Sequence, residues 1–85
     1  MPIISQFYGI AIYMFWREHE PAHFHAKYGD DEITVEIETG KVNGKMTPRA
    51  LALVQEWRKT HLAELKKEWT LVKLKKPLFP IKPLE

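Results

Sequence analysis

Three of the four histidines lie within seven residues, at His19, His23 and His25, and they are the side chains best suited to chemistry. If residues 23–28 form a strand, His23 and His25 lie on the same face, about 7 Å apart along the backbone. Imidazole changes its charge near neutral pH and also binds metal ions. The cluster therefore suggests either acid–base catalysis or metal binding.

Acid–base catalysis needs no cofactor in this cluster. Two neighbouring imidazoles can divide the roles of general base and general acid, which suits cleavage of an RNA phosphodiester. A cation such as Arg17 or Lys27 would stabilise the negative charge that develops on the phosphate. On this hypothesis the protein is a metal-independent ribonuclease, with His23, His25 and Arg17 as its catalytic residues.

A metal site would use His19, His23 and His25, or would take Glu36 from the neighbouring strand as its third ligand. Glu36 could instead orient His25 from behind, as carboxylates do around metal-bound histidines. The spacing matches no zinc signature, so the sequence alone does not favour a metal. The alternative is structural, with one histidine packed under the loop and the others facing solvent.

Charge is distributed unevenly along the chain. Residues 1–40 hold two basic and seven acidic residues, a net charge of −5, whereas residues 41–85 hold eleven basic and four acidic residues, a net charge of +7. The basic half predicts a surface for RNA or for an acidic protein partner. We expect Lys66, Lys67 and Lys73 to contact phosphates, with Lys27 and Glu36 binding beside the histidines. The alternative is a solvated, lysine-rich helix face.

Several classes of enzyme are excluded by missing residues. The chain has no cysteine, no glycine-rich phosphate loop and no HExxH zinc motif, and its single serine, Ser5, lies in no nucleophile motif. His61 falls on the apolar side of a predicted helix, which indicates a core or cap residue. Trp57 and Trp69 lie on the same apolar side and are expected in the core.

The length of 85 residues fits one domain, and the balance of 45% hydrophobic and 28% charged residues is that of a globular protein. The first sixteen residues carry no charged side chain, but they are shorter than the roughly 20 apolar residues of a membrane span. We therefore expect no membrane association. The chain has no cysteine and therefore no sign of disulfides or of an oxidising compartment. We therefore expect a cytoplasmic location.

Residues 1–45 have the composition of strands, with many aromatic residues and isoleucines. We predict strands over residues 3–7, 10–17, 23–28 and 32–38, and a short edge strand or loop over residues 41–45. In the third and fourth strands the alternation places Phe24 and Ala26 on an apolar face, opposite the histidines. The predicted register pairs Tyr28 with Ile33.

Residues 47–75 predict two helices, over residues 48–59 and 61–75, from apolar residues at intervals of three and four. Thr47 is the expected N-cap and Pro48 the first helical residue. The fold class is therefore α+β, with a small antiparallel sheet covered by two helices. The proline-rich tail, residues 77–85, should be extended and should bury its apolar residues on this chain, on a second copy or on a partner.

The segment H-x-P-x-H-F-H-A-x-Y-G at residues 19–29, together with residues 2–10 and 49–57, resembles a bacterial family of domains of unknown function, family 4160. The resemblance covers nearly the whole chain. It implies a small protein encoded beside a second small protein, in an arrangement like that of toxin–antitoxin pairs. The protein would then act on RNA through its histidines, or it would bind the cognate protein without being an enzyme.

Overall fold

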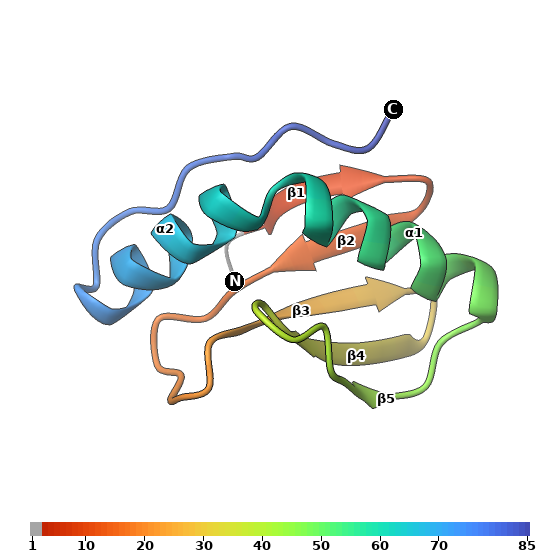
Figure 1. Ribbon diagram of the computed structural model, residues 1–85, viewed down its shortest axis with the longest axis horizontal. Coiled ribbons are helices and arrows are strands. Elements are labelled where there is room, and N and C mark those ends of the chain that lie inside the picture. The colour runs from red at the N-terminus through yellow and green to blue at the C-terminus, as the bar shows by residue number, and fades with distance from the viewer. Residues whose placement is uncertain (1–2) are drawn as a thin grey trace.

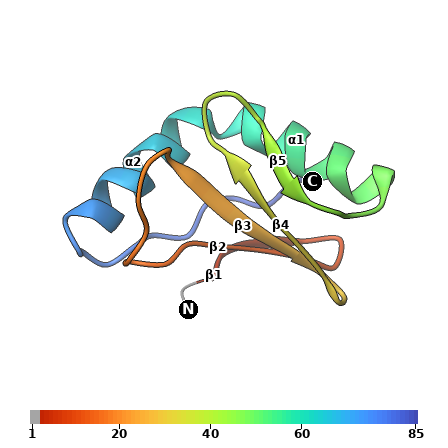
Figure 2. The same ribbon diagram turned by 90° about the horizontal axis from the view of Figure 1, so that it is seen from below.

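The computed structural model describes residues 3–85 and has two layers, a five-stranded antiparallel sheet and a pair of helices on one face of it (Figures 1 and 2). The strands lie side by side in chain order, as β1 Ile3–Phe7, β2 Ile10–Tyr13, β3 His23–Tyr28, β4 Asp31–Glu36 and β5 Val42–Gly44. The helices are α1 Pro48–Thr60 and α2 Leu62–Lys73. The predicted α+β class is confirmed. We call the face under the helices the inner face.

The second strand is shorter than predicted. It ends at Tyr13, and the chain then leaves the sheet to form the loop of residues 14–22 before β3 begins. The break between the helices falls at His61, close to the predicted position. Thr47 caps α1 as expected, because its hydroxyl accepts a hydrogen bond from the N–H of Ala50 at 3.3 Å.

The register of the β3–β4 hairpin differs from the prediction. Tyr28 pairs with Asp31 and not with Ile33, because the turn contains only Gly29 and Asp30. Gly29 adopts a φ of 61°, which suits a two-residue turn. The correction is a shift of two residues, so each side chain keeps its predicted face. Phe24 and Ala26 are fully buried on the inner face, whereas Tyr28 emerges at its end, 39% exposed.

Trp57 lies at the centre of the core and is fully buried. Its ring packs against Phe7 and Phe24 of the sheet, with ring centroids 5.6 Å away in both cases. Trp69 of α2 is also buried. Both tryptophans are therefore core residues, as predicted.

Beyond α2, the tail has no regular secondary structure and runs along the helices and β1 (Figure 1). The N–H of Ile81 donates to the carbonyl of Ile4 at 2.7 Å, and the Ile81 side chain is buried. The indole N–H of Trp57 donates to the carbonyl of Lys82 at 3.0 Å. The tail thus packs on its own chain.

Glu68 of α2 is a fully buried carboxyl that holds the tail. Its Oε1 accepts the N–H of Phe79 at 3.0 Å, whereas Oε2 is buried without a hydrogen-bond partner among residues 3–85. Burial raises the pKa of Glu68, although the hydrogen bond from Phe79 opposes this shift. An ionised Glu68 therefore costs the folded state free energy.

This buried carboxyl predicts a specific pH dependence. Because the pKa of Glu68 is raised in the folded state, the folded state binds its proton more tightly than the unfolded state, and stability falls as pH rises through the folded pKa. Glu68→Gln should remove this loss, so its advantage over the wild type should grow as pH rises. Urea unfolding at a series of pH values measures the effect, with exposed Glu56→Gln as the control. Parallel profiles for wild type and Glu68→Gln would contradict the argument.

No helix within residues 3–85 combines the length and the apolar character that crossing a membrane requires.

Candidate metal centre

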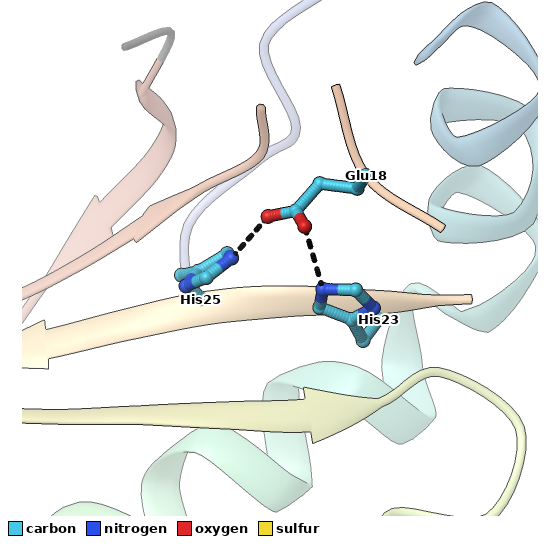
Figure 3. A group of neighbouring side chains, drawn as sticks. All are labelled: Glu18, His23 and His25. Carbon is cyan, nitrogen blue, oxygen red and sulfur yellow. Dashed lines mark hydrogen bonds and ion pairs between the residues drawn. The ribbon is translucent and has the colours of Figure 1, made fainter. Parts of the chain in front are cut away.

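The histidine cluster is formed by β3 and the loop that precedes it. His23 and His25 alternate with the buried Phe24 and Ala26, so both rings project from the face opposite the inner face. The loop of residues 14–22 folds back across the start of β3 and brings Glu18 over the two rings (Figure 3). We call Glu18, His23 and His25 the histidine–glutamate cluster.

The three side chains of the cluster point toward one another. Nε2 of His25 lies 2.6 Å from Oε1 of Glu18, and Nε2 of His23 lies 3.5 Å from Oε2 of the same carboxylate (Figure 3). One possible ligand atom from each residue falls within 4.8 Å of the others. The side chains are only 13–16% exposed. The cluster is therefore compact and partly shielded from water.

His23 is held by its other ring nitrogen. Its Nδ1 lies 2.8 Å from the carbonyl oxygen of Pro21. A carbonyl can only accept, so Nδ1 must carry the proton and donate it. In neutral His23, Nε2 therefore has a free lone pair directed toward Glu18. The ring also packs against Trp69, with centroids 5.3 Å apart, which fixes its plane.

His25 sits between two aromatic rings. It stacks on Tyr13 at a centroid distance of 5.3 Å and meets Phe15 edge-on at 4.8 Å. Its Nδ1 is buried and has no hydrogen-bond partner among the described residues 3–85, although Oε2 of Glu32 lies 3.8 Å away. If His25 is neutral and donates from Nε2 to Glu18, the lone pair of Nδ1 is left buried and unpaired.

Tyr13 forms a wall of the cluster and takes no part as a base. Burial, followed by the neighbouring Glu32 carboxylate, raises the pKa of Tyr13 to about 12. The phenol therefore stays protonated and neutral throughout the physiological range.

The remaining residues predicted at this site lie around the cluster and do not join it. His19 and Arg17 are exposed in the loop, and Lys27 is exposed on β3. Glu36 pairs with His23 in the sheet, not with His25, and its carboxylate accepts a hydrogen bond from the Thr39 hydroxyl at 3.0 Å. His61 is half-buried at the N-cap position of α2, where its side chain makes no capping bond to the backbone and its Nδ1 lies 2.6 Å from the Glu64 carboxylate.

The predicted phosphate contacts on α2 are engaged in other interactions. Lys66 forms an ion pair with Glu38 at 3.0 Å, and Lys73 forms one with Glu20 at 3.6 Å. The ammonium group of Lys67 lies over the ring of Phe79 in the tail, 5.9 Å from its centroid. Two of these three lysines therefore already have an acidic partner.

Glu18 is the residue of the cluster that the sequence analysis missed. Alternation within β3 places the two histidines on one face, but Glu18 comes from an irregular loop. The only signal was its position, five residues before His23 in a stretch rich in histidine and glutamate.

These features define a small two-layer α+β protein with two histidines and a glutamate converging on the outer face of its sheet. The chain belongs to the family described as domain of unknown function (DUF4160), whose family model matches residues 9–70. The match confirms the resemblance seen in the sequence, and it includes the whole histidine–glutamate cluster but not the tail. No curated protein and no solved structure matches the chain significantly.

Proposed function

We propose that the protein binds a divalent transition-metal ion, with Glu18, His23 and His25 as its ligands. Two imidazoles and one carboxylate form a donor set that suits Zn²⁺ and related ions. Three protein ligands leave a further position for water or a substrate, as in catalytic zinc sites. The cluster also lies in the half of the chain with a net charge of −5, which favours a cation over an anionic ligand.

The buried Nδ1 of His25 carries this proposal. Without an ion, a neutral His25 that donates from Nε2 to Glu18 leaves Nδ1 buried and unpaired. A metal ion at Nε2 replaces that proton, and Nδ1 then carries the ring hydrogen. This N–H would point toward Glu32, whose Oε2 lies 3.8 Å from Nδ1, so a small movement of Glu32 would let its carboxylate orient a metal-bound His25.

Titration with Zn²⁺ tests the proposal. We expect one ion per chain, and we expect Glu18→Ala, His23→Ala and His25→Ala each to weaken binding strongly. His19→Ala is the matched control, because this histidine is exposed in the same loop and lies outside the cluster. Calorimetry and elemental analysis of protein purified without chelator give the affinity and the stoichiometry. Equal losses in His19→Ala and His23→Ala would refute a specific site.

A ribonuclease of a toxin–antitoxin-like pair is the second candidate function. It is supported by the closeness of the two imidazoles, whose ring centroids are 5.4 Å apart. His23 and His25 would then act as acid and base, with Arg17 at the phosphate. In this role, chelator-treated protein should cleave RNA with a bell-shaped pH profile, and either histidine-to-alanine variant should lose the activity. The metal proposal expects no cleavage under these conditions.

A further inference from the structure

Two exposed tyrosines border a hollow at the far end of β3 from His23. The start of α1 and the turns that join β1 to β2 and β3 to β4 lie at this same end of the molecule (Figure 1). The hollow, which we call the tyrosine pocket, has a volume of about 280 Å³ and is lined by Tyr8, Ile10, Tyr28, Thr47, Arg49, Ala50 and Leu53. It shares no residue with the histidine–glutamate cluster.

Tyr8 has a positive φ that its turn requires but that a tyrosine adopts only with strain. It is the first residue of the two-residue turn between Phe7 and Ile10, and its φ is 48°. Turns in which both central residues have a positive φ strongly prefer asparagine, aspartate or glycine at the first position and glycine at the second. The Tyr8 side chain is 58% exposed, so its ring does not offset the strain by filling the core. Neither the turn nor the core accounts for a tyrosine at this position, which is consistent with a role of its ring in binding.

Tyr28 lies beside this turn, and Gly9 leaves room for its ring. The Tyr28 ring passes over Gly9 so closely that a Cβ added there would lie 3.3 Å from Cε1 of the ring. Gly9 also has a φ of 80°, which any other residue would adopt only with strain. The Tyr28 ring, 39% exposed, therefore lies on the turn at the wall of the pocket.

The other wall of the pocket belongs to a basic segment. Residues 40–55 contain Lys41, Lys45 and Arg49 and no acidic residue. Arg49 is exposed and forms no hydrogen bond or ion pair with another side chain in residues 3–85. Asp31 pairs directly with Tyr28 from the neighbouring strand β4, but it does not line the pocket. A ligand in the pocket thus meets aromatic surface on one side and positive charge on the other.

We infer that the tyrosine pocket binds single-stranded RNA, with a base stacked against Tyr8 or Tyr28 and a phosphate at Arg49. Exposed aromatic rings beside cations are the common means of holding single strands, because every base offers a stacking face. A chain of nucleotides suits the site better than a free nucleotide, because exposed Lys45, two residues before Thr47 of the pocket, adds a second positive charge for a neighbouring phosphate. RNA binding at this pocket requires no metal ion.

Fluorescence anisotropy with a labelled ten-nucleotide RNA, in low salt and with chelator, tests this inference. Tyr8→Asn should weaken binding about 10-fold or more, since one stacking ring is lost. The same variant should keep or raise the melting temperature, because asparagine fits the turn. Leu74→Asn is the matched control, since Leu74 is equally exposed, at 58%, and lies outside the pocket. Arg49→Gln should weaken RNA binding. It should also reduce the slope of log affinity against log salt concentration by about one, because one phosphate contact is lost.

Several results would overturn the inference. Equal losses in Tyr8→Asn and Leu74→Asn would show that the pocket is not the site. Binding of a mononucleotide as tight as that of the ten-nucleotide RNA would show that the ligand is a free nucleotide. RNA binding that His23→Ala abolishes and Tyr8→Asn leaves intact would move the RNA to the histidines. Failure of the zinc titration would leave these measurements unaffected.

Discussion

Zn²⁺ added to metal-free protein is expected to raise its free energy of unfolding, and His25→Ala is expected to abolish the gain. An ion that binds only the folded state stabilises it by mass action, by about 2.7 kcal/mol when its free concentration is 100 times the dissociation constant. The fold holds the possible ligand atoms of Glu18, His23 and His25 within 4.8 Å of one another, so the ion should bind the folded chain more tightly than the unfolded chain. Chemical unfolding with and without the ion measures the gain, and chelator should reverse it.

The stabilisation by Zn²⁺ should also differ in size from one variant to another. Glu32→Gln leaves the three ligands in place but removes the carboxylate that faces Nδ1 of His25, so affinity for the ion should fall about 10- to 100-fold. His61→Ala should keep the full gain, because His61 lies between the helices and bonds to Glu64. Because the histidines must be unprotonated to bind, the gain should shrink toward acidic pH. A gain of equal size in His25→Ala would place the ion elsewhere.

The hairpin shows which structural features can be predicted from alternation. The faces of β3 and β4 were predicted correctly because side chains alternate with a period of two, and Phe24 and Ala26 could only share a face. The register was predicted wrongly because it depends on the length of the turn. Registers that differ by two residues place the same side chains on the same faces, so periodicity cannot distinguish them. Only the backbone at Gly29 and Asp30 decides the pairing.

The site was predictable only where it lies on regular structure. His23 and His25 belong to a strand, so their common face follows from their spacing. Glu18 belongs to the loop of residues 14–22, whose path depends on packing against the rest of the molecule and on no periodic pattern. The ion pairs of the α2 lysines could not be predicted for a related reason. Their acidic partners, Glu20 and Glu38, are brought to α2 by the tertiary fold.

Buried charged groups were likewise hidden from the sequence. Arg58 is 7% exposed, and its guanidinium donates to the carbonyl of Ile37 at 2.8 Å and to Gln55 at 2.8 Å. Helical spacing alone would predict Arg58 on the polar, solvent-facing side of α1. Gln55 lies one turn earlier in α1, but the carbonyl of Ile37 lies in the chain after β4, which the sequence does not place beside α1. Arg58 therefore ties α1 to the end of the hairpin that carries the histidines.

The largest loss of stability is expected at Trp57, where sheet, helix and tail meet. Its ring contacts Phe7 and Phe24, and its indole N–H holds the carbonyl of Lys82. Trp57→Ala should lower the free energy of unfolding by about 3–5 kcal/mol, the usual cost of removing a buried aromatic ring. A domain of this size has only about 4–13 kcal/mol in total, so the variant should be barely folded.

Trp57→Phe separates packing from attachment of the tail. Phenylalanine keeps a ring against the sheet but cannot donate a hydrogen bond to the carbonyl of Lys82. The free energy of unfolding should therefore fall by about 1 kcal/mol more than the smaller ring alone would cause, which is the typical net value of one hydrogen bond. Deleting residues 78–85 from both proteins tests this partition by urea unfolding. Without the tail, the N–H has lost its partner in the wild type as well, so the difference between tryptophan and phenylalanine should narrow. An unchanged difference would mean that Trp57 stabilises the fold through ring packing alone.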